Sequence, residues 1–147
     1  MTEYDLLLRL FVALVLGGLV GIERQQLHKP AGVRTYMLVC LGSCLFTLIS
    51  FMAFTDLQQF YFEPTRIAAG VVTGIGFLGA GAIIQSQKKV LGLTTAASIW
   101  VVAAIGMAVG YGLFILAGGA SLLSVIALYF LEKMGDGHNS QDDQSEN

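Results

Sequence analysis

The chain has 147 residues, of which 55% are hydrophobic and 12% charged, and its formal net charge is −2 at pH 7. With only eight basic residues it has no basic face for nucleic acid, and its mean hydropathy of +0.72 exceeds that of soluble domains. This composition excludes a nucleic-acid-binding or ordinary water-soluble domain. It predicts an all-α, polytopic membrane bundle with the lipid bilayer as its surroundings.

The first predicted span begins near the N-terminus, where Thr2 and Asp5 have the spacing of a capping box. We expect this span to be retained rather than cleaved as a signal peptide. Residues 10–22 are uncharged but short, so Arg9 either reaches back to the interface or forms an embedded ion pair with Asp5. Gly17 and Gly21 form a G-x-x-x-G step, which predicts a close helix contact.

A charged loop over residues 23–34 separates this span from a second one, over residues 35–55. Cys40 and Cys44 are one helical turn apart within the second span, and we expect them to act as small packing residues. Residues 56–66 return to polarity, and the aromatic run at 60–62 suits a membrane interface.

The third predicted span is rich in glycine and uncharged between Arg66 and Lys88. Its small residues lie on both sides of the helix, which predicts close neighbours on both sides and a central place in the bundle. The glycines expected to pack are Gly70, Gly74 and Gly81 on one face, with Gly76 and Gly79 on the other. A G-x-G-x-x-G match occurs here, but no strand or following acidic residue supports nucleotide binding.

No charged residue occurs over residues 90–131, which as one helix would extend for roughly 63 Å, about twice the membrane. We therefore predict two spans with a turn at Gly110-Tyr111-Gly112, and we expect Gly106 and Gly110 to pack against neighbouring helices. The result is a five-span transmembrane domain over residues 1–134, followed by a disordered polar tail over 135–147. The distribution of lysine and arginine predicts an outside N-terminus and a cytoplasmic C-terminus.

No nucleophile, base or metal-ligand set has a catalytic spacing, so we expect neither an enzyme nor a cofactor or metal site. The polar residues that remain gather at the cytoplasmic ends of the spans. We predict that a pocket there is formed by Glu23, Arg24, Arg34, Thr35, Thr94 and Thr95. A helix starting near Thr94 would offer free amides to an anion, or else Thr94 caps that helix and the loops form salt bridges.

Five blocks of the chain resemble the MgtC/SapB family: Gly21-Ile22-Glu23-Arg24-Gln25, Ala31-Gly32-Val33-Arg34-Thr35, Arg66-Ile67-Ala68-Ala69, the run from Thr73 to Gly81, and Gly92-Leu93-Thr94-Thr95-Ala96-Ala97 with Trp100. The resemblance implies a bacterial inner-membrane protein. It also implies links to growth in low magnesium, to virulence and to restraint of the F-type ATP synthase. The chain departs from the family pattern at Gly70 and Leu91, where glutamine and arginine are common.

From these observations we expect a non-enzymatic membrane protein, a homo-oligomer, that modulates ion homeostasis by contacting another membrane complex such as the F-type ATP synthase. The alternative is an ion or small-solute transporter or channel that uses the pocket at the cytoplasmic helix ends. In that case the glycine-rich helix would be locally unwound.

Overall fold

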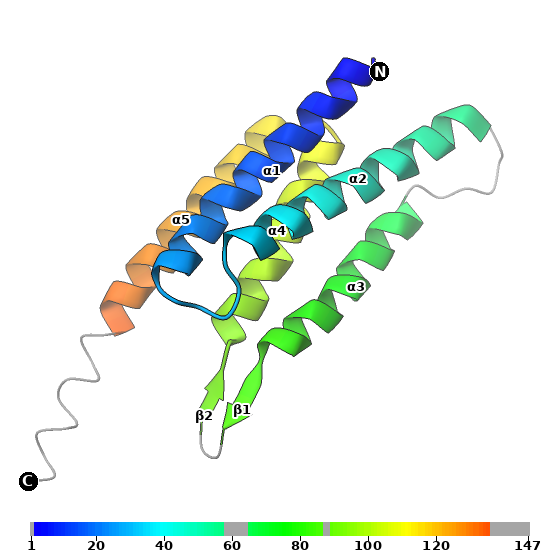
Figure 1. Ribbon diagram of the computed structural model, residues 1–147. Coiled ribbons are helices and arrows are strands. Elements are labelled where there is room, and N and C mark those ends of the chain that lie inside the picture. The colour runs from blue at the N-terminus through cyan, green and yellow to red at the C-terminus, as the bar shows by residue number, and fades with distance from the viewer. Residues whose placement is uncertain (1, 58–64, 87–88, 136–147) are drawn as a thin grey trace, which may run out of the picture.

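The computed structural model describes residues 2–57, 65–86 and 89–135, with side chains over 2–52, 66–83 and 90–130. It contains five helices and one short hairpin, which run up and down as a bundle (Figure 1). The elements are α1 (Glu3–Gln26), α2 (Val33–Leu57), α3 (Thr65–Ala82), β1 (Ile84–Ser86), β2 (Lys89–Leu91), α4 (Leu93–Gly110) and α5 (Phe114–Gly135). The predicted all-α class is confirmed.

The predicted start of the first helix and the predicted turn between the last two are both present. Thr2 is the N-cap of α1, and its hydroxyl accepts a 3.4 Å hydrogen bond from the amide of Asp5. The chain reverses after Gly110, where Gly112 has a left-handed φ of +80° and the amide of Leu113 donates to the carbonyl of Ala108 at 2.9 Å. Glycine adopts this conformation without the penalty that a Cβ atom would bring.

A short β-hairpin, formed by β1 and β2, connects α3 to α4. β1 and β2 pair antiparallel, with Ile84 opposite Leu91, and so extend both helices beyond their ends (Figure 1). Gly92 follows with φ +88°, and a Cβ atom there would lie 1.9 Å from the carbonyl oxygen of Ala82. The start of α4 is therefore held directly against the end of α3.

The centre of the bundle is α4, which packs against all four other helices. Helix α3, predicted to be central, packs mainly against α4 and α2 and lies at one edge (Figure 1). The structure therefore corrects the predicted arrangement. The abundance of small residues on a helix shows how closely a neighbour could approach, but it does not show which neighbour is present.

Close helix contacts occur at four glycines, two on α1 and two on α4. A Cβ atom on Gly17 would lie 2.6 Å from Cβ of Cys40, and one on Gly21 would lie 2.7 Å from Cα of Val33. A Cβ atom on Gly106 would lie 2.1 Å from the carbonyl oxygen of Cys40, and one on Gly110 would lie 2.6 Å from Cβ of Thr47. These glycines hold α2 between α1 and α4, and the buried Cys40 and Cys44 lie in the same contacts.

The glycines of α3 have no such contacts within this chain. Nothing in the described structure lies within 4 Å of an added Cβ atom at four positions, and at Gly79 the nearest atom is Cβ of Ala96 at 3.7 Å. The four positions are Gly70, Gly74, Gly76 and Gly81. No helix of the described single chain therefore packs closely against these four glycines in the way that had been predicted for them.

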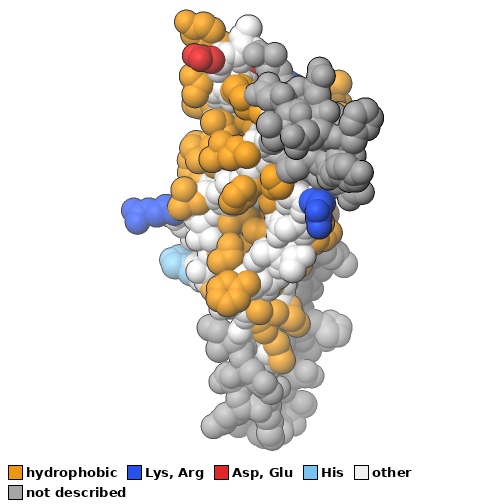
Figure 2. Space-filling model, turned by 90° about the vertical axis from the view of Figure 1, so that its right-hand side faces the viewer, with side chains coloured by type: hydrophobic (Ala, Val, Ile, Leu, Met, Phe, Trp, Pro, Cys, Tyr) orange, Lys and Arg blue, Asp and Glu red, His pale blue; other side chains and the backbone are white. Residues whose placement is uncertain are grey.

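The outside of the bundle is apolar, as expected of a membrane protein. Figure 2 shows mostly hydrophobic and uncharged side chains on the face that includes α3, and Phe77 is 82% exposed. Among the described residues, three stretches are long and apolar enough to cross a membrane: Glu3–Gln26, Val33–Met52 and Leu93–Gly110. Arg66–Ala82 and Phe114–Phe130 are apolar but shorter. The predicted interfacial aromatic run at 60–62 and the predicted tail beyond Gly135 lie outside the described residues.

Candidate functional site

A buried ion pair lies at the C-terminal end of α1, between residues that are adjacent in the sequence. The guanidinium of Arg24 donates from Nε and Nη2 to the two carboxylate oxygens of Glu23. Arg24 is 2% exposed and Glu23 is 8% exposed, so both charges are withdrawn from solvent. A positive charge in the last turn also complements the helix dipole. Removing one member would leave a buried, uncompensated charge, which is far more costly than losing the pair together.

A second polar group joins α2 to α4 beside this ion pair. The hydroxyl of Tyr36, which is fully buried, lies 2.5 Å from that of Ser98, and the Ser98 hydroxyl donates to the carbonyl of Thr95 at 2.9 Å. Tyr36 is within electrostatic reach of both Glu23 and Arg24. The three helices α1, α2 and α4 therefore meet at one polar cluster. We call Glu23, Arg24, Tyr36, Thr95 and Ser98 the buried polar cluster.

The structure divides the six residues of the predicted pocket into two groups. Glu23, Arg24 and Thr95 are buried in the cluster, whereas Arg34, Thr35 and Thr94 are exposed near the starts of α2 and α4. Sequence reasoning missed Tyr36 and Ser98. A signal existed for Ser98, because a polar residue three positions after Thr95 lies on the same helix face.

The N-terminus of α4 differs from the predicted arrangement at Thr94. The N-cap is Gly92, which provides no side-chain hydrogen bond, and its carbonyl accepts from the amide of Ala96 at 2.9 Å. Thr94 is therefore already inside the helix and does not cap it. The close approach of Gly92 to the end of α3 also places the backbone carbonyl of Ala82 beside this helix start.

At the opposite end of the bundle, Arg9 joins three helices. Its Nη2 atom lies 3.3 Å from the Asp5 carboxylate, and its Nη1 atom donates to the carbonyl of Gly110 at 2.8 Å. The guanidinium also lies 5.9 Å from the ring centre of Phe114. The ion pair with Asp5, one of the two alternatives from the sequence, is present, and its arginine additionally caps the C-terminus of α4.

The described residues contain no group of three or more histidine, cysteine, aspartate or glutamate side chains arranged to hold a metal ion. Two cavities lie away from the buried polar cluster. One lies between α2 and α3, and the other is a smaller apolar space between α3 and α4 beside Trp100. The side chains of the cluster are themselves buried, so the cluster is a packed polar contact among helices.

Comparison with known proteins relates most of the chain to one family. The model of the MgtC family matches residues 10–136. The putative magnesium transporter YhiD of Escherichia coli K12 is 44% identical over 127 residues, which cover 84% of this chain and 59% of that protein. Protein MgtC of Salmonella typhimurium LT2 is 41% identical over 133 residues, covering 90% and 55%. Protein SapB of Bacillus subtilis is 36% identical over 131 residues, covering 86% and 56%.

The chain thus spans somewhat more than half the length of these curated relatives. No solved structure matches it.

Proposed function

This chain belongs to the MgtC family, and from that membership we propose a non-enzymatic protein that acts in magnesium homeostasis by modulating another membrane complex. The membrane is the bacterial inner membrane. The complex that we propose is the F-type ATP synthase, which the family resemblance suggested. The protein would act by contact rather than by carrying an ion.

We further propose that all five helices cross the bilayer. At 1.5 Å per residue the 18 residues of α3 extend for about 27 Å, close to the hydrocarbon thickness of about 30 Å. The loop over residues 23–34 and strand β2, which begins at Lys89, belong to the same end of the up-and-down bundle (Figure 1). The positive-inside rule assigns that end to the cytoplasm and the N-terminus to the outside.

The observation that carries the proposal is the mutual neutralisation of Glu23 and Arg24 in the interior. These charges are paired and shielded by helix packing, which suits a structural support better than a binding site for a passing cation. Helix α3 is also one uninterrupted helix from Thr65 to Ala82, including the glycine-rich run. A transporter with a broken helix would need that run to unwind.

The exposed residues at the same end of the bundle as the buried polar cluster form the proposed contact surface. Arg34, Thr35 and Thr94 lie near the starts of α2 and α4, at the end of the bundle assigned to the cytoplasm. The buried polar cluster would hold the ends of α1, α2 and α4 together, and the exposed residues would contact the partner complex. The open glycine faces at Gly76 and Gly81 support self-association of α3 in a homo-oligomer.

A flux measurement separates modulation from transport. Purified protein is reconstituted into vesicles that contain a magnesium-sensitive dye, and external Mg²⁺ is raised. We expect the same leak as in protein-free vesicles. Saturable uptake that Arg34→Gln abolishes would overturn the proposal and establish the alternative, a transporter.

Inverted membrane vesicles test the proposed partner directly. ATP-driven proton pumping is followed by dye quenching with and without this protein, at equal ATP synthase content. We expect slower acidification with the wild-type chain and normal acidification with Arg34→Gln. The matched variant Glu23→Gln should instead lower stability, by about 3 kcal/mol, because it removes the carboxylate that pairs with the buried guanidinium of Arg24. Unchanged pumping with folded wild-type protein would exclude this partner.

A further inference from the structure

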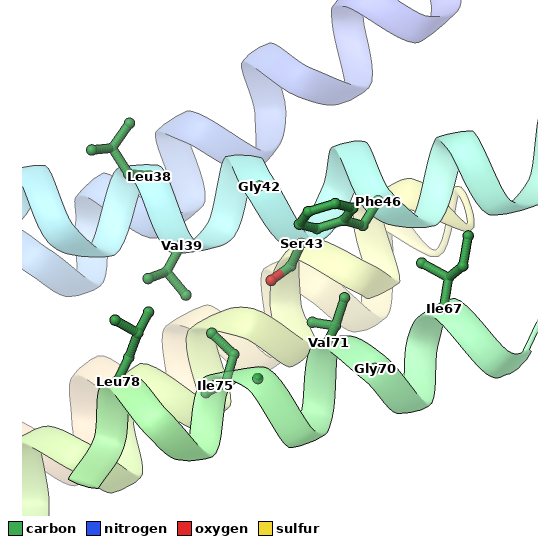
Figure 3. A pocket seen from close by; sticks show the side chains of 11 residues that line it. Leu38, Val39, Gly42, Ser43, Phe46, Ile67, Gly70, Val71, Ile75 and Leu78 are labelled. Atoms are coloured by element: carbon green, nitrogen blue, oxygen red, sulfur yellow. The ribbon is translucent and has the colours of Figure 1, made fainter. Parts of the chain in front are cut away.

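A long apolar groove separates α2 from α3 and has a volume of about 740 Å³. Figure 3 shows Val39 and Phe46 on the α2 wall, opposite Val71, Ile75 and Leu78 on the α3 wall. Ser43 is the single polar side chain that lines it. Both the size and the apolar lining are typical of a ligand site rather than of an ordinary gap between packed helices.

The groove has the length of one bilayer leaflet. Its α3 wall extends from Ile67 to Leu78, or about 16 Å at 1.5 Å per residue, and half of the hydrocarbon thickness is about 15 Å. Gly42, Gly70 and Gly74 line the space and have no atom within 4 Å of an added Cβ atom. The groove is therefore wide because three side chains are missing from its walls.

The lining of the groove suits a hydrocarbon chain. Ten of the eleven residues that line it are apolar or glycine. A single acyl chain can lie along the groove at full length, in contact with both helices.

A positive charge lies at one end of the groove. Arg66 directly precedes the lining residue Ile67 in the first turn of α3, and it is exposed. Among the described side chains no carboxylate forms an ion pair with it. A guanidinium binds phosphate through two parallel hydrogen bonds, and the positive end of the helix dipole adds to the attraction. The other end, at Leu78, is apolar.

We propose that the groove between α2 and α3 binds one phospholipid, with its phosphate at Arg66 and one acyl chain extended toward Leu78. The lipid completes the edge of the bundle, where the helices of a single chain leave the glycines of α3 uncovered. The site prefers an anionic headgroup, because an additional negative charge is attracted to the same guanidinium.

Native mass spectrometry of the full chain, released from detergent with added phosphatidylglycerol or phosphatidylethanolamine, tests this proposal. We expect one retained lipid per chain, with more phosphatidylglycerol retained than phosphatidylethanolamine.

Gly74→Leu should remove the lipid adduct, since the new side chain occupies the groove, without lowering the thermal stability of the protein. Gly119→Leu on α5 is the matched control, because it adds the same side chain to open space outside the groove. Arg66→Gln should weaken retention about tenfold, as expected for a lost charge-assisted hydrogen bond, and Arg66→Lys should restore part of it.

A bilayer measurement locates the lipid. Phosphatidylglycerol with a diazirine in the middle of one acyl chain is cross-linked to the protein in vesicles. We expect labelled peptides from α2 and α3 in wild type and in Gly119→Leu, but not in Gly74→Leu. Equal labelling of Gly74→Leu would overturn the proposal. So would a Gly74→Leu protein that keeps its lipid but changes from dimer to monomer, because the groove would then be an interface between copies.

Discussion

Replacing Gly106 by alanine tests the central packing of the bundle with a single methyl group. The new Cβ atom would lie 2.1 Å from the carbonyl oxygen of Cys40, a backbone atom that no rotamer change can move. Helices α2 and α4 must separate by about 1 Å before this contact reaches 3.0 Å, below which real Cβ contacts essentially do not occur. The hydrogen bond between Tyr36 and Ser98, which joins the same two helices, is weakened by the separation.

The expected cost follows from two opposing effects. Overpacking a tight interior costs about 1–3 kcal/mol, whereas alanine gains at most about 1 kcal/mol over glycine in helix propensity. The net loss is about 1–2 kcal/mol, which corresponds to a fall in Tm of about 2–8 °C for a chain of this size. The Tm is measured in a mild detergent by heating, removing aggregates and quantifying the folded protein on a gel-filtration column.

Gly119→Ala on α5 is the matched control, because it makes the same chemical change in an apolar helix but meets no atom within 4 Å. Its Tm should equal or slightly exceed that of wild type. If the two variants were equally stable, the contact between Gly106 and the α2 backbone would not exist as described, and α4 would lose its central place.

Two further changes test the polar contacts between helices. Arg9→Met removes the 2.8 Å hydrogen bond to the Gly110 carbonyl and should lower the free energy of unfolding by about 1–2 kcal/mol. Asp5→Asn should lower it by less than about 0.5 kcal/mol, because the Asp5 carboxylate is partly exposed. If Arg9→Met and Asp5→Asn lowered the thermal stability equally, the stabilisation would come from the ion pair and not from the hydrogen bond that caps α4. A double-mutant cycle with Tyr36→Phe and Ser98→Ala should give a coupling of about 1 kcal/mol, and strict additivity would contradict the hydrogen bond between α2 and α4.

The ends of the helices could be predicted because local chemistry determines them. Thr2 caps α1, and the glycines around Tyr111 end α4, by interactions that involve only a few neighbouring residues. The close contacts at Gly17 and Gly106 also followed from local spacing, since a G-x-x-x-G step presents one bare face whichever helix approaches it.

The neighbours of each helix could not be predicted in the same way. Helix α3 has more glycines than α4, yet α4 is central, because the backbone of α2 lies against Gly106 and Gly110. The candidate site could be predicted only in part for the same reason. Glu23 and Arg24 could be identified from the sequence because they are charged, but the hydrogen bond between Tyr36 and Ser98 depends on how α2 packs against α4.

The pairing of Glu23 with its immediate neighbour affects how the protein assembles during synthesis. Because the two residues are consecutive, their charges can cancel as soon as α1 emerges from the ribosome, before α4 has been translated. The charge of Arg24 is therefore already neutralised when the first two helices come together, and the later helices enclose a pair that is already formed. If the ion-pair partner of Glu23 were on a helix translated later, the Glu23 carboxylate would remain without it until that helix was inserted.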